Sequence, residues 1–255
     1  MRTGTNAGAW ILGAACLLAT ACGPGGESAP AVERLEEGGV QIVVSGRPAW
    51  DDEAGSLVHI WLLDAEGRVL RDFGESPGDD RAQYESAIMP RPLGKITVQA
   101  LTTERAYIGT ADAYEIQVWS LDGTLRQRWR RATGDLSIGE DEIGALLAEE
   151  SSDSLLGQQL RFLRRELTDP PIPEALPAYS RFVVDATDHL WVENYRLLGR
   201  GPHRWSIFAP DGVWLGELEV PDTFDVTDIG EDYVLGVYRD ELDEQSIRMY
   251  GLVRT

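Results

Sequence analysis

Acidic side chains are the residues of this chain best suited to chemistry, because many of them gather in short runs. One run extends from Asp222 to Asp232 and includes Asp225 and Asp228, and another extends from Asp240 to Glu244. Calcium takes about six to eight oxygen ligands, and carboxylates are common among them. Neither run has the alternating aspartates, central glycine and terminal glutamate of a calcium-binding loop. Asp225 and Asp228 are therefore candidate metal ligands, with solvated acidic loops as the simpler alternative.

The histidine and serine residues lack the spacing that zinc binding or nucleophilic catalysis requires. His59, His189 and His203 show neither the H-x-x-x-H nor the H-x-H spacing of a zinc site. We expect each histidine at the surface or in a turn. No serine lies in a G-x-S-x-G elbow, and residues 199–202 lack the Gly-Lys-Ser/Thr end of a phosphate-binding loop. The sequence therefore predicts no catalytic residue and no cofactor, and it favours a non-enzymatic role without excluding an enzymatic one.

Cys22 is the residue with the clearest predicted chemistry. It follows Arg2 and an uncharged run, residues 7–21, that ends in small residues. The run is shorter than the roughly 20 apolar residues of a membrane-spanning helix, and this order is typical of a signal peptide. Residues 18–22, Leu-Ala-Thr-Ala-Cys, resemble a bacterial lipobox. The resemblance implies that the cysteine takes a diacylglycerol and becomes the N-terminus; the alternative is an ordinary secretory peptide that is cut nearby.

These N-terminal features predict where the protein resides. We expect residues 1–21 to form the signal peptide, and residues 22–35, which contain Gly-Pro-Gly-Gly, to form a flexible tether. Several acyl chains on Cys22 would anchor the protein stably in a membrane. The predicted location is the cell envelope, at the periplasmic face of the outer membrane or at the cell surface.

Composition constrains the remaining domain, residues 36–255. The formal net charge is −20, which argues against a nucleic-acid partner because a phosphate backbone requires a basic surface. Both cysteines, Cys16 and Cys22, precede this domain, so it has neither a disulfide nor a thiolate metal site. Its length suits a single domain that is stabilised by its own core.

A hairpin pattern recurs three times in this domain, at residues 59–73, 116–129 and 205–218. Each copy has an apolar strand, an Asp-Gly or Glu-Gly step and a second strand. The step suits a tight turn with positive φ at the glycine. Strand pairs such as residues 182–192 precede the hairpins, so a unit of about 40–45 residues recurs. The unit has the size of one β-propeller blade and predicts an all-β, propeller-like fold.

One segment, residues 136–168, breaks the strand pattern. Residues 142–150 and 155–165 are rich in leucine, alanine and charged side chains, and the leucines of the second stretch fall at helical spacing. Pro170 and Pro171 end this pattern. We therefore predict a helical insertion between two blades.

Residues 177–252 are similar to the C-terminal blades of bacterial six-bladed β-propellers of the NHL-repeat-like type. The similarity lies in Phe-Val-Val-Asp at 182–185, Leu-Trp-Val at 190–192 and the hairpin at 205–216. The resemblance implies a secreted or lipid-anchored propeller, although only about four blade units can be counted. An incomplete ring exposes sheet edges, so we expect either closure by a homo-oligomer or a truncated relative.

Three functions follow from these observations. We favour a binding or scaffolding module that presents a propeller to a protein, peptide or glycan ligand. The first alternative is a calcium-dependent lactonase or esterase. Gluconolactonase-like propellers hold one metal with carboxylates and an asparagine, and Glu193-Asn194, at the end of a predicted strand, resembles part of that set. The second alternative is a truncated relative that retains no activity.

Overall fold

The computed structural model describes residues 41–51, 55–83, 88–152, 154, 157–158, 160–161 and 172–254. The predicted signal peptide, the tether and Cys22 lie outside these residues, so the anchor remains a prediction. No helix in the described part of the chain is long and apolar enough to cross a membrane.

Four antiparallel sheets make up most of the molecule, and in each of them strands that are consecutive in the sequence pair with one another. The first sheet contains β1 (Gln41–Asp51), β2 (Gly55–Leu63) and β3 (Val69–Pro77). The second contains β6 (Val98–Leu101), β7 (Arg105–Gly109), β8 (Glu115–Ser120) and β9 (Leu125–Arg130). The third contains β10 (Tyr179–Val184), β11 (Leu190–Asn194), β12 (His203–Phe208) and β13 (Trp214–Val220). The fourth contains β14 (Phe224–Ile229), β15 (Tyr233–Arg239) and β16 (Gln245–Gly251).

A short ladder of β4 (Arg81–Gln83) and β5 (Ile88–Pro90) connects the first and second sheets along the chain. None of the sheets closes on itself, because each strand order has two free ends. The all-β prediction is confirmed.

The three predicted hairpins are confirmed as β2–β3, β8–β9 and β12–β13. Their turn glycines, Gly67, Gly123 and Gly212, have φ of +78°, +86° and +91°. Glycine reaches this left-handed region without the steric cost that a Cβ imposes. The recurring Gly step therefore specifies the recurring turn.

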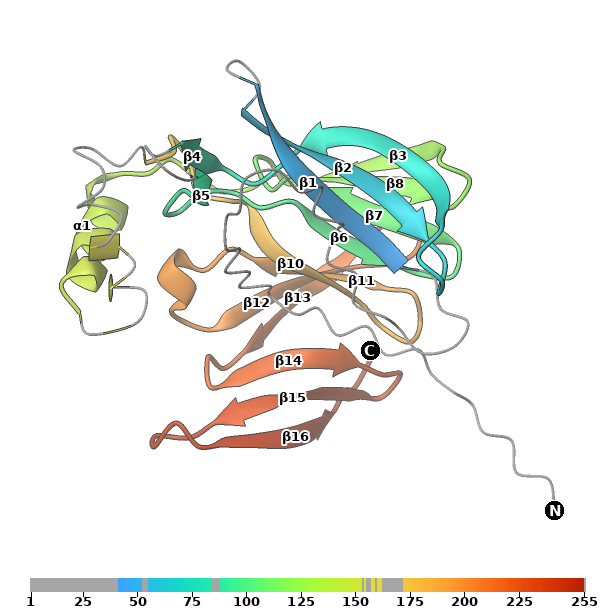
Figure 1. The fold of residues 1–255 in the computed structure, drawn as a ribbon. Coiled ribbons are helices and arrows are strands. Elements are labelled where there is room, and N and C mark those ends of the chain that lie inside the picture. The colour runs from blue at the N-terminus through green and yellow to red at the C-terminus, as the bar shows by residue number, and fades with distance from the viewer. Residues whose placement is uncertain are drawn as a thin grey trace.

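The four sheets lie face to face in series and form one stack, which runs from the first sheet to the fourth in Figure 1. The first strand of each sheet contacts the first strand of the next: β1 contacts β6, β6 contacts β10, and β10 contacts β14. The stack therefore has an inner side, formed by these four strands, and an outer side, formed by the last strand of each sheet.

Alternating apolar residues form the cores between neighbouring sheets. In β8, Ile116 and Val118 face the third sheet and are almost completely buried, whereas Trp119 faces the first sheet and contacts Phe73 edge to face. This alternation is the period of two that a strand buried on both faces requires. Burial of one such apolar side chain contributes about 1.5–3 kcal/mol.

Close packing between the second and third sheets depends on Tyr179 and Gly109. The buried Tyr179 hydroxyl donates to the Glu115 carbonyl at 2.7 Å and accepts from the Ala111 amide at 3.2 Å. A Cβ on Gly109 would lie 2.8 Å from Tyr179 Cζ, inside contact distance. Only glycine allows the ring to approach β7 so closely.

The helix α1 (Glu140–Glu150) lies between β9 and β10, as predicted for the insertion. Its first turn is acidic, which complements the positive end of the helix dipole. Buried Leu146 and Leu160 pack against Leu93, next to the short ladder. The ends of the insertion pair through a bridge between Ser137 and Ala175. Most of the second predicted helical stretch, residues 155–165, lies outside the described residues.

Candidate functional site

The Glu193-Asn194 pair ends β11, as predicted, and alternation directs its two side chains to opposite faces of the third sheet. Glu193 faces the fourth sheet, and on that face of the third sheet it pairs with Arg181 of β10. The Asn194 Oδ1 atom faces the second sheet and lies 3.5 Å from the Tyr114 hydroxyl. The two residues therefore belong to separate polar networks, and they do not converge on one ligand position.

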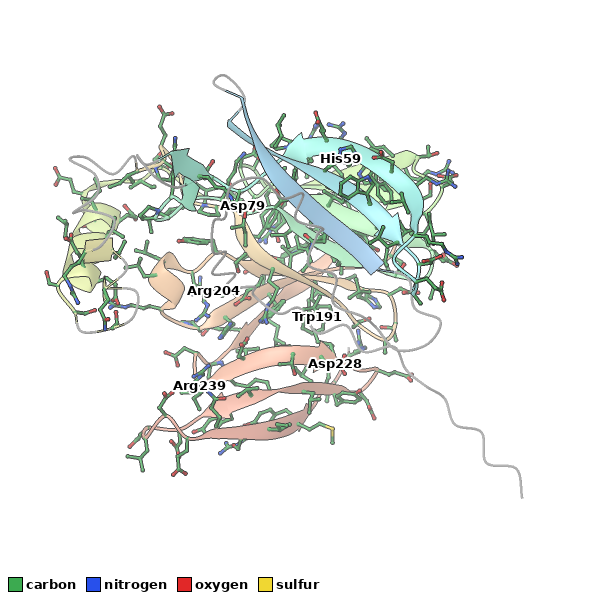
Figure 2. All side chains as sticks on the ribbon, in the orientation of Figure 1. His59, Asp79, Trp191, Arg204, Asp228 and Arg239 are labelled. Atoms are coloured by element: carbon green, nitrogen blue, oxygen red, sulfur yellow. The ribbon has the colours of Figure 1, made fainter. Side chains whose placement is uncertain are left out.

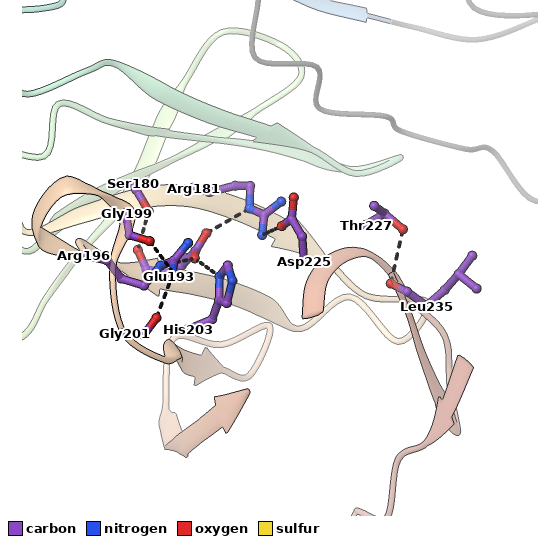
Figure 3. A network of polar contacts seen from close by, with 10 residues as sticks. All are labelled: Ser180, Arg181, Glu193, Arg196, Gly199, Gly201, His203, Asp225, Thr227 and Leu235. Carbon is purple, nitrogen blue, oxygen red and sulfur yellow. Dashed lines mark hydrogen bonds and ion pairs between the residues drawn. The ribbon is translucent and has the colours of Figure 1, made fainter. Parts of the chain in front are cut away.

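Glu193 is a buried carboxylate whose two oxygens both have partners. His203 Nδ1 lies 2.5 Å from Oε1, and Arg196 Nε lies 3.5 Å from the same oxygen. Arg181 Nε donates to Oε2 at 3.0 Å. Figure 3 shows these groups converging on Glu193 from β10, β12 and the loop after β11. Such pairing offsets the cost of burying the negative charge.

Arg181 links Glu193 to Asp225. Its Nη2 donates to Asp225 Oδ1 at 3.0 Å, and its guanidinium lies 4.9 Å from the Trp205 ring. The contact joins β10 to β14, so it connects the third sheet to the fourth. Two of the predicted metal ligands, Glu193 and Asp225, are thus brought together, but an arginine occupies the space between them.

The pKa of Glu193 is lowered. Burial by itself raises the pKa, but the hydrogen bond from His203 and the charges of Arg181 and Arg196 outweigh burial. The carboxylate therefore stays ionised at neutral pH, which suits an acceptor of hydrogen bonds. A general acid needs the opposite shift, towards neutral pH.

The network on the other face of the third sheet centres on Ser206. This fully buried hydroxyl donates to Asn194 Oδ1 at 3.3 Å and accepts from Arg131 Nη1 at 2.5 Å. Arg131 also pairs with Glu217 at 2.7 Å and lies 4.8 Å from the Trp214 ring. Ser206 has no histidine partner here, so the arrangement lacks the base that activates a nucleophilic serine.

Asp228 is on the same strand as Asp225 but has a different partner from the other three candidates. It is on the fourth sheet (Figure 2), where its Oδ2 accepts a 3.2 Å hydrogen bond from the Tyr233 hydroxyl. In the second acidic run, Asp240 Oδ1 accepts from the amides of Leu242 and Glu244, both at 2.9 Å, and so shapes the turn between β15 and β16. Within the described ranges, no group of three or more histidine, cysteine or acidic residues is placed to hold a metal ion.

One expectation from sequence is wrong. His203 is not at the surface or in a turn: it is 3% exposed, in the first position of β12. The other partners of Glu193, Arg181 and Arg196, are likewise not recognisable as site residues from their spacing. Glu193 pairs with Trp205 across the strands, which places His203 two residues away on the same face. The sequence signal that could have found His203 is this alternation, but it can be used only when the pairing register of the strands is known.

No protein-family model matches the chain, and no curated protein matches it.

Proposed function

We propose that this protein is a lipid-anchored, extracytoplasmic binding or scaffolding module with a propeller-like stack of sheets. In this proposal the anchor at Cys22 holds the stack at the cell envelope, and the stack presents its surface to a protein, peptide or glycan. No catalytic role is assigned to any residue.

The observation that favours the binding role over the metal-dependent alternative is the pairing of the buried polar groups. Both oxygens of Glu193 are engaged by His203, Arg196 and Arg181, and Asp225 is engaged by Arg181. A metal or substrate that used Glu193 would have to displace these partners and leave buried charges unpaired, which costs about 3–5 kcal/mol. The network therefore serves to join the third and fourth sheets.

The arrangement of the sheets supports the propeller-like part of the proposal. Each sheet is a meander, and the first strands of successive sheets contact one another in chain order. Radial repetition of such sheets around an axis defines a propeller. Repeat architectures of this kind commonly provide extended binding surfaces.

Capture from envelope extracts tests the binding role. The bait is the full chain, purified in mild detergent and immobilised, and the matched control is the same preparation after heat denaturation. We expect one partner in near-stoichiometric amount on the native bait, quantified by mass spectrometry. Equal recovery of every protein on native and denatured bait would contradict the proposal.

A further inference from the structure

Part of the outward face of the fourth sheet is apolar and exposed, next to Asp228 of β14, which pairs with Leu235 on the same face. Ile247 and Met249 of β16 are 79% and 67% exposed, and they lie on the face opposite to Tyr250, which contacts Phe224 on the side of the third sheet. Across the ladder, Ile247 pairs with Val237 and Met249 pairs with Leu235. Four apolar side chains thus form a contiguous patch, which we call the terminal face. Contiguous exposed apolar patches mark interaction surfaces.

The terminal face occupies positions that are buried in the preceding sheets. Ile247 and Met249 lie in the third strand of their sheet, as Ile116 and Val118 do in the second sheet. Ile116 and Val118 are 0% and 3% exposed because they pack against the third sheet. Trp205, in the same strand position of the third sheet, packs against the fourth. The terminal face is therefore the surface on which this architecture places a following sheet.

At the other end of the stack, no sheet of the described residues precedes the first one. A Cβ on Gly212 would meet the Trp129 ring of the sheet before it, and a Cβ on Gly123 would meet Arg71 of the sheet before it. The equivalent Gly67 has no atom of the described residues within 4 Å of such a Cβ. Trp61, stacked on His59, is on the face of β2 opposite to Leu62, which packs against the second sheet.

We propose that the terminal face binds the first sheet of a second copy of this chain. Reciprocal contacts of this kind join two stacks of four sheets into a closed ring of eight sheets, within the range of about four to eight blades known for propellers. The pairing has twofold symmetry, so it closes without forming a filament. It goes beyond the proposed binding role, because it assigns a partner to a particular surface.

A second copy accounts for both ends at once. The first and fourth sheets lie at opposite ends of the stack, where Figure 2 labels His59 and Asp228, so one copy does not bring its own two ends together. A peptide or another protein on the terminal face would leave the outer face of the first sheet without a neighbouring sheet among the described residues. A second copy supplies the missing neighbour of each end by the same face-to-face packing that joins the other sheets.

Molecular mass in solution tests the proposal. The probe is the full chain in density-matched detergent, measured by sedimentation equilibrium, and the test variant carries Ile247→Asp and Met249→Asp. We expect twice the mass of one chain for the wild type and a twofold lower mass for the variant. The control Val213→Asp, at an exposed apolar residue of the turn between β12 and β13, should retain the wild-type mass.

Cysteine cross-linking identifies the surfaces in contact, and circular dichroism checks that each variant is folded. A chain with Trp61→Cys and Met249→Cys should form a covalent dimer on oxidation, because the domain has no other cysteine after Cys22. Met249→Cys alone should stay monomeric on a non-reducing gel. A monomeric wild type, a mass that grows beyond two chains with concentration, or a covalent dimer of Met249→Cys alone would each overturn the proposal.

Discussion

At the scale of single residues, this protein uses buried carboxylates to fix the ends of its sheets. Asp185, in the turn between β10 and β11, is 4% exposed. Its oxygens accept hydrogen bonds from Trp191 Nε1 and Arg254 Nη2, both at 2.9 Å, and from the Thr187 amide at 2.8 Å. Arg254 also donates to the Gly230 carbonyl, so this one carboxylate ties the C-terminal segment to the third sheet.

Asp185→Asn should therefore destabilise the protein. The amide keeps the shape of the carboxylate but cannot accept from all of these donors, so donors remain buried and unsatisfied. We expect the free energy of unfolding in urea to fall by about 3 kcal/mol at pH 7. The control Asp222→Asn changes an exposed carboxylate and should alter stability by less than about 0.5 kcal/mol.

The effect of Asp185→Asn should depend on pH. Burial raises the pKa of Asp185, but the hydrogen bonds from Trp191, Thr187, His189 and Arg254 outweigh burial, and the net pKa is lowered. A carboxyl group with a lowered pKa stabilises the fold above its unfolded pKa of 3.8 and loses this contribution as the pH falls through the folded pKa. The wild type and the variant should thus converge in stability below about pH 4. A constant difference across this range would show that the charge of Asp185 is irrelevant.

Calcium should not stabilise the protein, because the oxygens of Glu193 are already engaged. We expect the Tm to agree within about 1 °C in millimolar calcium and in chelator, since a ligand that binds only the native state would raise it. Scanning calorimetry of the full chain measures this. A calcium-dependent rise in Tm that Glu193→Gln or Asp225→Asn abolishes would instead support the metal-dependent alternative.

At the scale of elements, the turn glycines have two effects: they permit positive φ, and they leave room for packing on the preceding sheet. One pair of substitutions separates the two effects. Gly212 and Gly123 both have positive φ, so alanine is strained at either position. At Gly212 the new Cβ would also lie 2.7 Å from Cε2 of the packed Trp129 ring, whereas at Gly123 it would meet the movable side chain of Arg71. Gly212→Ala should therefore cost more than Gly123→Ala, by about 1–3 kcal/mol. Equal losses in urea unfolding would mean that the turn does not pack on the preceding sheet.

The sequence predicts the elements whose signal is local. Asp-Gly and Glu-Gly steps flanked by apolar alternation predict three hairpins, and the pattern of residues 142–150 predicts α1. β14 is harder to predict, because a bulge between Val226 and Asp228 shifts its alternation, and acidic residues separate its apolar ones. The strands β4 and β5 have three residues each, too few to show a period.

The contacts of the candidate site could not be predicted, because they depend on register. Glu193, His203 and Arg181 come from three strands, and they meet only because Glu193 pairs with Arg181 on one side and with Trp205 on the other. Spacing along the chain carries no such information. The sequence therefore identifies Glu193 and Asn194 as the end of a strand, but not the groups that hydrogen-bond to their side-chain oxygens.

At the scale of the whole molecule, stacking of the sheets explains both what is buried and what is left exposed. Aromatic residues such as Trp191, Trp205 and Tyr107 fill the spaces between sheets, whereas the terminal face has no sheet on it in one copy of the described chain. A formal net charge of −20 makes two copies of the chain repel each other. The proposed pairing of two copies must therefore rely on specific packing of the terminal face.

Acylation of Cys22 is the step that would convert this stack into a protein of the cell envelope, so its loss tests the account most directly. The measurement is labelling of the full chain with radioactive palmitate in a bacterial host, followed by separation of membrane and soluble fractions. We predict label and membrane association for the wild type and for Cys16→Ser, and an unlabelled, soluble Cys22→Ser. A Cys22→Ser protein that remains labelled and membrane-bound would contradict the proposed anchor.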